Sequence, residues 1–249
     1  MMEPLFRSIE MTAAAATRLV GTKITYQGLE NIPERGGAVV AINHTSYIDF
    51  LPAGLATRRR RRRIRYMLKA EMQNVRMVNF LIKRARAIPV NRQSGAEAYA
   101  EAVAKLRAGE LVGVYPEATI SRSFELKEFK SGAARMALEA GVPIIPMIIW
   151  GVHRMWTKDH PRALGRKNFP VTVRVCPAVP PAGTVAEVNS ALREEMKRNL
   201  HEVQEQYPHP AGAYWVPRRL GGSAPTPEEA RRLDAAERVQ RAQRAGGRC

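Results

Sequence analysis

The chain of 249 residues has only two cysteines, Cys176 and Cys249, and no apolar run long enough to cross a bilayer. Two cysteines exclude a disulfide scaffold, and a reducing compartment is therefore expected. The longest apolar run, 142–150, has the length of a strand and contains two prolines. Five histidines include no pair at metal-ligand spacing apart from the loosely spaced His153 and His160. We expect no metal, no membrane-spanning helix and, because the N-terminal apolar run is short, no signal peptide.

Acidic residues are scarce relative to basic ones. The sequence has 23 Asp and Glu against 40 Lys and Arg, a net charge of +17, which predicts an anionic partner. Six consecutive arginines occupy 58–63. Such a run could bind nucleic acid, hold the protein at an anionic membrane, attract the phosphates of CoA or an acidic carrier protein, or be a solvated loop. Because Tyr66 is the only aromatic residue near the run and no nucleic-acid fold signature accompanies it, we expect a membrane surface and no nucleic acid.

The pattern of apolar residues predicts strands that alternate with helices, which is typical of an α/β domain. Strands are expected at 23–26, 38–42, 64–68, 87–90, 111–115, 142–150 and 171–175, and helices at 3–20, 47–56, 75–83, 94–109, 129–140, 185–206 and 227–244. We therefore expect a single domain with a central sheet of about seven strands flanked by helices. An N-terminal helix at 1–22 precedes this domain at 23–207, and a basic, helical or disordered tail follows at 208–249.

Polar or charged residues follow four of the expected strands. They are His44 and Asp49, Lys69, Arg92, and Glu117 with Thr119. Ligands bind at the ends of strands in an open α/β sheet, so four such placements together predict one site.

His44 and Asp49 are five residues apart and would point about 140° away from each other on a continuous helix. They can face each other only if the chain turns between them. One interpretation is a general base, His44, whose tautomer is fixed by the Asp49 carboxylate. The other is a polar loop in which Asn43, Thr45 and Ser46 cap the following helix. This stretch alone leaves both open.

The stretch with His44 and Asp49 is the first of four short segments that together resemble the motifs of a known family. They are Asn-His-Thr-Ser-Tyr-Ile-Asp at 43–49, Ala-Ile-Pro-Val-Asn-Arg at 87–92, Tyr-Pro-Glu-Ala-Thr at 115–119 and Val-Pro-Ile-Ile-Pro at 142–146. The first resembles the His-X4-Asp motif of the glycerolipid acyltransferase family, and the others resemble its second, third and fourth motifs. Order and spacing agree over residues 24–180. The best-known members of that family are 1-acylglycerol-3-phosphate acyltransferases.

The resemblance implies a role for each candidate residue. His44 would take the proton of an acceptor hydroxyl, and Asp49 would stabilise the imidazolium that forms. Arg92 would bind the acceptor phosphate through its fork of donors, the alternative being a surface salt bridge. Glu117 would bind the acceptor or hold Arg92 and the loop in place. Ser46 is better explained as a turn hydroxyl than as a nucleophile, because no glycine-flanked elbow surrounds it.

Three further residues are weaker phosphate candidates. Thr119 could donate to the phosphate or cap the loop, and Lys69 and Lys130 could bind it or simply be solvated.

The third motif departs from the family at Ala118, where glycine is usual, and at Ile120, where arginine is usual. Arg122 or Lys127 could replace the missing arginine, or the acceptor could differ.

These observations predict transfer of a fatty acyl group from acyl-CoA or acyl carrier protein to 1-acylglycerol-3-phosphate, which gives phosphatidic acid. No cofactor other than the acyl donor is expected. The protein would act as a peripheral enzyme on the cytoplasmic side of the cell membrane. The alternatives are another lysophospholipid or glycolipid acceptor, or a catalytically weak member that binds lipid or nucleic acid.

Overall fold

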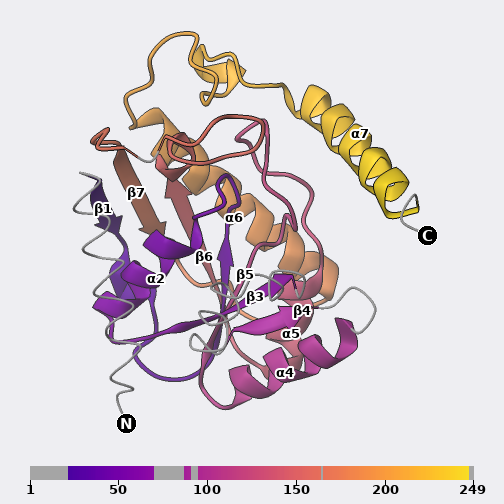
Figure 1. The fold of residues 1–249 in the computed structure, drawn as a ribbon. Coiled ribbons are helices and arrows are strands. Elements are labelled where there is room, and N and C mark those ends of the chain that lie inside the picture. The colour runs from indigo at the N-terminus through magenta and orange to yellow at the C-terminus, as the bar shows by residue number, and fades with distance from the viewer. Residues whose placement is uncertain (1–21, 70–86, 91–94, 164, 247–249) are drawn as a thin grey trace.

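The computed structural model describes residues 22–69, 87–90, 95–163 and 165–246 (Figure 1). Within these ranges the strands form one seven-stranded sheet in the order β1-β7-β6-β2-β5-β3-β4. Their bounds are β1 Lys23–Gln27, β2 Ala38–Ile42, β3 Ile64–Lys69, β4 Ile88–Val90, β5 Leu111–Val114, β6 Ile144–Trp150 and β7 Pro170–Val175. Strands β2 to β6 run parallel, whereas β7 is antiparallel to β6 and pairs in parallel with β1. The predicted α/β class and the number of strands are confirmed.

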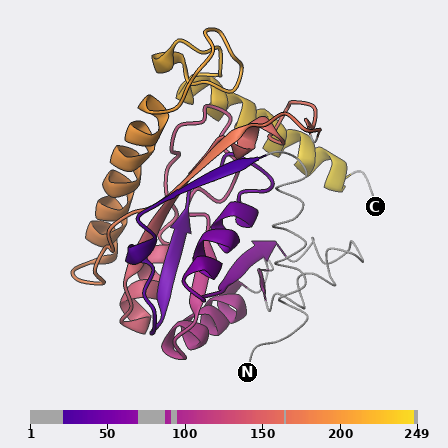
Figure 2. The same cartoon turned by 90° about the vertical axis from the view of Figure 1, so that its left-hand side faces the viewer.

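Helices cover both faces of the sheet. They are α2 Phe50–Arg59, α4 Gly95–Arg107, α5 Gly132–Ala140, α6 Val185–Glu205 and α7 Pro227–Gly246, with short 3-10 turns η1 Leu29–Asn31, η3 Val152–Arg154 and η4 Arg218–Leu220. Figure 2 shows α6 on one side of the sheet and α2 on the other. None of the helices in the described ranges combines the length and the apolar character needed to cross a bilayer.

Alternate residues of the central strands enter two separate cores. Val39 and Ala41 of β2 pack with α4, α5 and α6, whereas Val40 and Ile42 pack with α2 on the opposite face. All five residues of β2 and all seven of β6 are buried. A strand covered on both faces reads as a continuous apolar run, which explains why these strands could be located from their apolar runs without any alternation of polar and apolar residues. The run at 142–150 is therefore interior sheet.

Helix starts differ from the sequence prediction for identifiable reasons. The helix expected from residue 47 begins at Phe50, because residues 45–49 fold back so that backbone N–H groups can bind the Asp49 carboxylate. The helix expected from 129 begins at Gly132, because the preceding chain is tied to the third-motif loop by the Lys130 N–H bond to the Pro116 carbonyl. Gly141 ends this helix with φ +66°, as expected of a glycine after a C-terminus.

The chain after residue 207 is more firmly packed than a loose tail. Trp215, Val216 and Ala224 are buried in the core shared with α6, so the first part of the segment expected as a tail at 208–249 packs against the domain. The helix expected at 227–244 is present as α7. The helices expected at 3–20 and 75–83, and the first residue of the helix expected at 94–109, lie outside the described residues.

Candidate functional site

The carboxyl ends of β2, β5 and β6 meet at one edge of the sheet. Ala41 of β2 pairs with Val114 of β5, and Ile42 pairs with Met147 of β6, so the loops that follow these strands are neighbours. The loop after β2 carries His44 and the loop after β5 carries Glu117. These loops place the first and third motifs side by side, as expected for ligand sites in sheets of this kind.

The turn between His44 and Asp49 brings their side chains together. The His44 Nδ1 atom lies 3.1 Å from Asp49 Oδ2. The same oxygen accepts hydrogen bonds from the backbone N–H groups of Thr45 and Ser46, each at 2.8 Å. An Nδ1 proton shared with a carboxylate leaves Nε2 as the unprotonated, basic nitrogen. The geometry therefore gives His44 the tautomer of a general base.

Asp49 is fully buried, and burial raises the pKa of its carboxyl group. The bonds from His44 and from the N–H groups of Ser46 and Thr45 oppose that effect, because they stabilise the ionised form. A carboxylate held by three donors on one oxygen cannot reorient without losing all three bonds. The polar loop thus orients Asp49, and it does not cap α2, whose start has no side-chain cap bond.

Tyr115, which the sequence analysis did not single out, supports the histidine ring. The rings of His44 and Tyr115 stack with centroids 4.1 Å apart and an angle of 23° between their planes. The His44 side chain is 18% exposed, so its outer edge can meet a substrate while the inner edge faces Asp49. Tyr115 directly follows β5 and precedes the Pro-Glu pair of the third motif. Its position after a strand was the feature of the sequence that could have identified it as a site residue.

Glu117 joins the first and third motifs through backbone bonds. Its Oε1 accepts the His44 N–H at 2.8 Å and its Oε2 accepts the Lys127 N–H at 3.1 Å. In return the Ser121 N–H donates to the His44 carbonyl at 2.8 Å. Glu117 is 4% exposed, and burial raises its pKa to about 8. In this arrangement Glu117 positions the loops, and a direct contact with the acceptor stays a prediction.

The departures in the third motif have a structural basis. Ala118 has φ +59°, a left-handed conformation that glycine adopts without strain, so the glycine usual at this position is the less strained choice. Ile120 is 3% exposed and therefore belongs to the interior. Two residues later, Arg122 carries the cation of this loop, and Lys127 Nζ contacts the Thr119 hydroxyl at 2.6 Å. Thr119, Arg122 and Lys127 are thus brought to one side of the site.

A group of carboxylates and a lysine that the sequence analysis did not select completes this side. Arg122 bonds to Asp159 and to two residues of α7, Asp234 and Glu237. Lys158 reaches the same two α7 carboxylates. Lys158 lies beyond η3 and not directly after β6, so the strand-end argument could not have found it, and its place, like the contribution of α7, depends on tertiary packing.

The remaining candidates either have no side-chain bond to this group in the described part of the chain or cannot be placed. Lys130 is exposed just before α5. Lys69 is the last residue of β3, a strand parallel to β5, but the structure does not describe its side chain. Arg92 lies wholly outside the described residues. No cluster of metal-ligating side chains occurs in the part of the chain that is described.

The arginine run lies at the opposite edge of the sheet. Strand β3 begins at Ile64 directly after the run, and the starts of β2, β5 and β3 are in register. Arg60 pairs with Glu34 at 2.8 Å, and Arg62 donates to three backbone carbonyls at 2.6–2.8 Å. Part of the run at 58–63 therefore ties loops together at a distance from His44. Attraction of CoA phosphates to the site, one of the alternatives given for this run, has no support in this placement, and the expected membrane contact stays a prediction.

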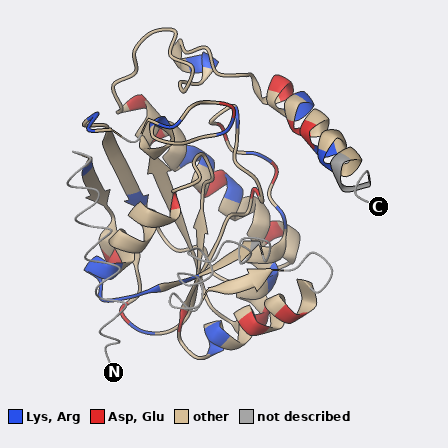
Figure 3. Ribbon diagram, viewed as in Figure 1, with Lys and Arg blue, Asp and Glu red and all other residues tan. Residues whose placement is uncertain are grey.

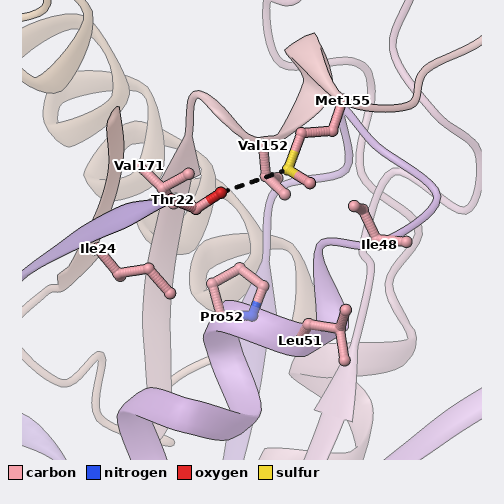
Figure 4. Close-up of a pocket in the computed structure, with 8 residues that line it drawn as sticks. All are labelled: Thr22, Ile24, Ile48, Leu51, Pro52, Val152, Met155 and Val171. Atoms are coloured by element: carbon pink, nitrogen blue, oxygen red, sulfur yellow. Dashed lines mark hydrogen bonds between the residues drawn. The ribbon is translucent and has the colours of Figure 1, made fainter. Parts of the chain in front are cut away.

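A small apolar pocket adjoins the first motif (Figure 4). It is lined by Thr22, Ile24, Ile48, Leu51, Pro52, Val152, Met155 and Val171, and its volume is about 40 Å³. Ligand pockets usually measure about 300–1,000 Å³, so this one is too small for an acyl chain. The pocket is an apolar surface next to Asp49 in sequence, since Ile48 and Leu51 contribute to its lining.

Comparison with known proteins agrees with this geometry. A family model described as Acyltransferase matches residues 23–150. The 1-acyl-sn-glycerol-3-phosphate acyltransferase of Borreliella burgdorferi is 28% identical over 147 residues, which are 57% of this chain and 56% of that protein. The Bacillus subtilis protein of the same name is 29% identical over 123 residues, 49% of this chain and 60% of its own length. The chain therefore spans less than two thirds of these two relatives.

A solved structure shares the fold. The crystal structure of the 1-acyl-sn-glycerophosphate (LPA) acyltransferase PlsC from Thermotoga maritima superposes with a TM-score of 0.67. The two chains are 24% identical, and the match covers 82% of this chain and 81% of the other. The likeness extends beyond the residues matched by the family model, since it covers more of the chain.

Proposed function

The chain belongs to the Acyltransferase family, and on that premise we propose that it transfers a fatty acyl group from a thioester donor to 1-acylglycerol-3-phosphate. The observation that carries the proposal is the contact of His44 Nδ1 with a buried Asp49 whose position is fixed by two backbone N–H groups. The names of the similar proteins support the choice of acceptor. The donor would be acyl-CoA or acyl carrier protein.

The proposed reaction needs one base and no covalent intermediate. The acceptor hydroxyl attacks the carbonyl carbon of the thioester while His44 Nε2 takes the hydroxyl proton. Asp49 stabilises the imidazolium across the 3.1 Å contact. The C–S bond then breaks, and the departing sulfur leaves as a thiol with the proton from His44. The products are the new ester and the free thiol, and His44 returns to its neutral form.

Ser46 is occupied in a way that supports the absence of an acyl-enzyme. Its hydroxyl donates to the Trp156 carbonyl at 2.6 Å and accepts the Ile48 N–H at 3.2 Å. The first bond holds the loop after β6 against the first motif, and the second orients the Ser46 side chain within the motif. A serine that is used as a structural link and has no adjacent base is a poor nucleophile.

Two exposed aromatic residues support action at a membrane surface. Tyr47 lies within the His44–Asp49 turn and Phe50 directly follows it, and the two are 45% and 40% exposed. Aromatic side chains with polar neighbours suit the interface of a bilayer, where a lysophospholipid acceptor resides. The Arg162 guanidinium lies 3.9 Å from the Trp156 ring centroid beside them and adds a positive charge. We place this face against the cytoplasmic leaflet as a peripheral contact.

A panel of acceptors tests the proposal. The full chain is incubated with labelled palmitoyl-CoA and, in turn, 1-acylglycerol-3-phosphate, lysophosphatidylcholine, lysophosphatidylglycerol and a glycolipid. The proposal expects the highest kcat/KM for 1-acylglycerol-3-phosphate. Other acceptors are included because Ile120 replaces the arginine usual in the third motif. Preference for one of them would reassign the substrate. No transfer to any acceptor, with either acyl-CoA or acyl carrier protein as donor, would overturn the proposal.

A further inference from the structure

Three cations gather beside the His44 loop, and we call Arg122, Lys127 and Lys158 the cationic cluster. The Arg122 side chain is 8% exposed and that of Lys158 10%. Arg122 follows Ser121, whose N–H bonds to the His44 carbonyl. Lys158 follows Thr157, whose hydroxyl bonds to the Thr45 carbonyl at 2.8 Å. The cluster is therefore fixed to two adjacent residues near the start of the first-motif loop.

The partners of the cluster come mainly from α7. Asp234 bonds to both Arg122 and Lys127 and lies 3.6 Å from Lys158 Nζ. Glu237, one helical turn on, contacts Arg122 at 2.9 Å and Lys158 at 3.0 Å. Figure 3 shows the acidic residues of α7, which stands beside the loops of the sheet edge.

The hold of α7 on the rest of the protein is chiefly ionic. Within the described side chains, no α7 residue belongs to either apolar core, and only Ala230 among its apolar residues is buried. Leu233 and Val239 are 46% and 56% exposed. The segment before α7 is different, because Val216 and Ala224 are fully buried. The Arg122, Lys158 and Asp234 side chains are 8%, 10% and 14% exposed, and the cost of taking such charges out of water offsets much of their mutual attraction. The helix can therefore leave while its stem stays anchored.

The charges of this group suit a phosphate. Arg122, Lys127 and Lys158 face the three carboxylates Asp159, Asp234 and Glu237. Without the two α7 carboxylates, three cations face Asp159 alone, which leaves a charge of +2. A phosphomonoester carries about −1.5 to −2 near neutral pH. The guanidinium of Arg122 and two ammonium groups also supply the donors that phosphate oxygens accept.

We propose that the cationic cluster is a binding site for a phosphomonoester, and that Asp234 and Glu237 occupy it as an internal competitor until the phosphate displaces α7. The identity of the natural ligand rests on the proposed function, because that ligand would be the phosphate group of 1-acylglycerol-3-phosphate. The helix would then act as a strap over the site, released by the substrate. Tyr47, which flanks His44, lies within the electrostatic reach of Glu237 and Arg122, so release of α7 changes the surroundings of the reacting groups.

The chain offers a closely matched control. Glu237 forms an i,i+4 pair with Arg241 and also reaches the cluster, whereas Glu228 forms an i,i+4 pair with Arg232 on the same helix. Glu237→Gln and Glu228→Gln therefore remove the same charge and the same kind of helical pair. Their difference isolates the contact with the cluster.

Limited trypsin digestion tests the strap without any need for catalysis. The full chain is digested in glycerol 3-phosphate or in sodium chloride of equal ionic strength, and cleavage after Arg231, Arg232 and Arg238 is followed by mass spectrometry. We expect several-fold faster cleavage of α7 with glycerol 3-phosphate, and Glu237→Gln to show fast cleavage already in sodium chloride. Equal rates in both salts, with Glu237→Gln indistinguishable from Glu228→Gln, would overturn the proposal.

Kinetics supply the second arm. Asp234→Asn combined with Glu237→Gln is expected to lower KM for 1-acylglycerol-3-phosphate several-fold, while Glu228→Gln leaves it unchanged. An unchanged KM in the double variant rejects internal competition even if acyl transfer is normal. Loss of transfer to every acceptor would reject the proposed function instead, and the digestion result would still decide whether phosphate releases α7.

Discussion

At the scale of single residues, the Asp49 carboxylate determines which nitrogen of His44 is basic. In Asp49→Asn an amide oxygen at the Oδ2 position can still accept the N–H groups of Thr45 and Ser46 and that of His44 Nδ1. The neutral amide carries no charge, however, so it cannot stabilise the imidazolium that forms when His44 takes a proton. We expect kcat to fall by about 10²–10⁴-fold. Steady-state kinetics with circular dichroism as a folding control measure this, and an unchanged kcat in a folded variant contradicts the role given to the Asp49 charge.

Glu117 makes the stability of the protein depend on pH. Its pKa is about 8 in the fold because burial disfavours the charged form, and it lies near 4.5 when the chain is unfolded. The folded state therefore binds the extra proton between these values, so this group's contribution falls as pH rises from about 4.5 to 8 and is constant above. Relative to Glu117→Gln, the wild type should lose stability between pH 5 and 8 in urea unfolding. A pH-independent difference would contradict a raised pKa.

Ala118 is strained in a way that glycine would relieve. A left-handed residue other than glycine costs about 1–2 kcal/mol, while the added freedom of glycine in the unfolded chain costs about 0.4–1 kcal/mol. Because Ala118 has φ +59° and is exposed, Ala118→Gly should stabilise the fold by about 0.5–1 kcal/mol. Chemical denaturation measures the gain. A loss of stability would show that the left-handed turn is not retained in solution.

At the scale of elements, glycine permits the close packing of β5. A Cβ added to Gly113 would collide with Ile64 and lie 3.0 Å from the Tyr66 ring, both on the neighbouring strand β3. Gly113→Ala should therefore cost about 1–3 kcal/mol. Gly132, the first residue of α5, has nothing within 4 Å of such a Cβ, so Gly132→Ala is the matched control and should be neutral or slightly stabilising. Equal effects of the two substitutions in thermal unfolding would contradict the packing described for β3 and β5.

The same scale shows why strands were predicted better than helix starts. The apolar run of β2 and the turn residues around it are local properties, and they located the strand at the observed residues, 38–42. The start of α2 depends on which N–H groups Asp49 binds, and the start of α5 on the bonds of Glu117 and Lys130 to distant backbone. The bonds at the start of α5 join residues that are far apart in sequence, and those at the start of α2 decide which of two local conformations forms. The spacing of apolar residues contains no information about either kind of bond.

At the scale of the whole molecule, topology determined which predicted residues share a site. His44, Asp49 and Glu117 could be named from their positions after strands, and parallel pairing of β2 with β5 unites them. The arginine run was prominent in the sequence, yet the topology carries it to the far edge. The carboxylates of α7 were inconspicuous in a basic tail, but they contact the loops of the site. Tertiary packing alone decides such assignments.

The role of His44 as the base of an acyl transfer can be tested by a comparison of three proteins. Transfer of labelled acyl groups from acyl-CoA to 1-acylglycerol-3-phosphate is compared for the wild type, His44→Ala and the control His201→Ala. His201 is a partly exposed histidine of α6 that lies 3.4 Å from Glu125. We predict that the wild type and His201→Ala transfer at similar rates and that His44→Ala is slower by at least about 10²-fold. Transfer by a folded His44→Ala protein at the wild-type rate would contradict the account.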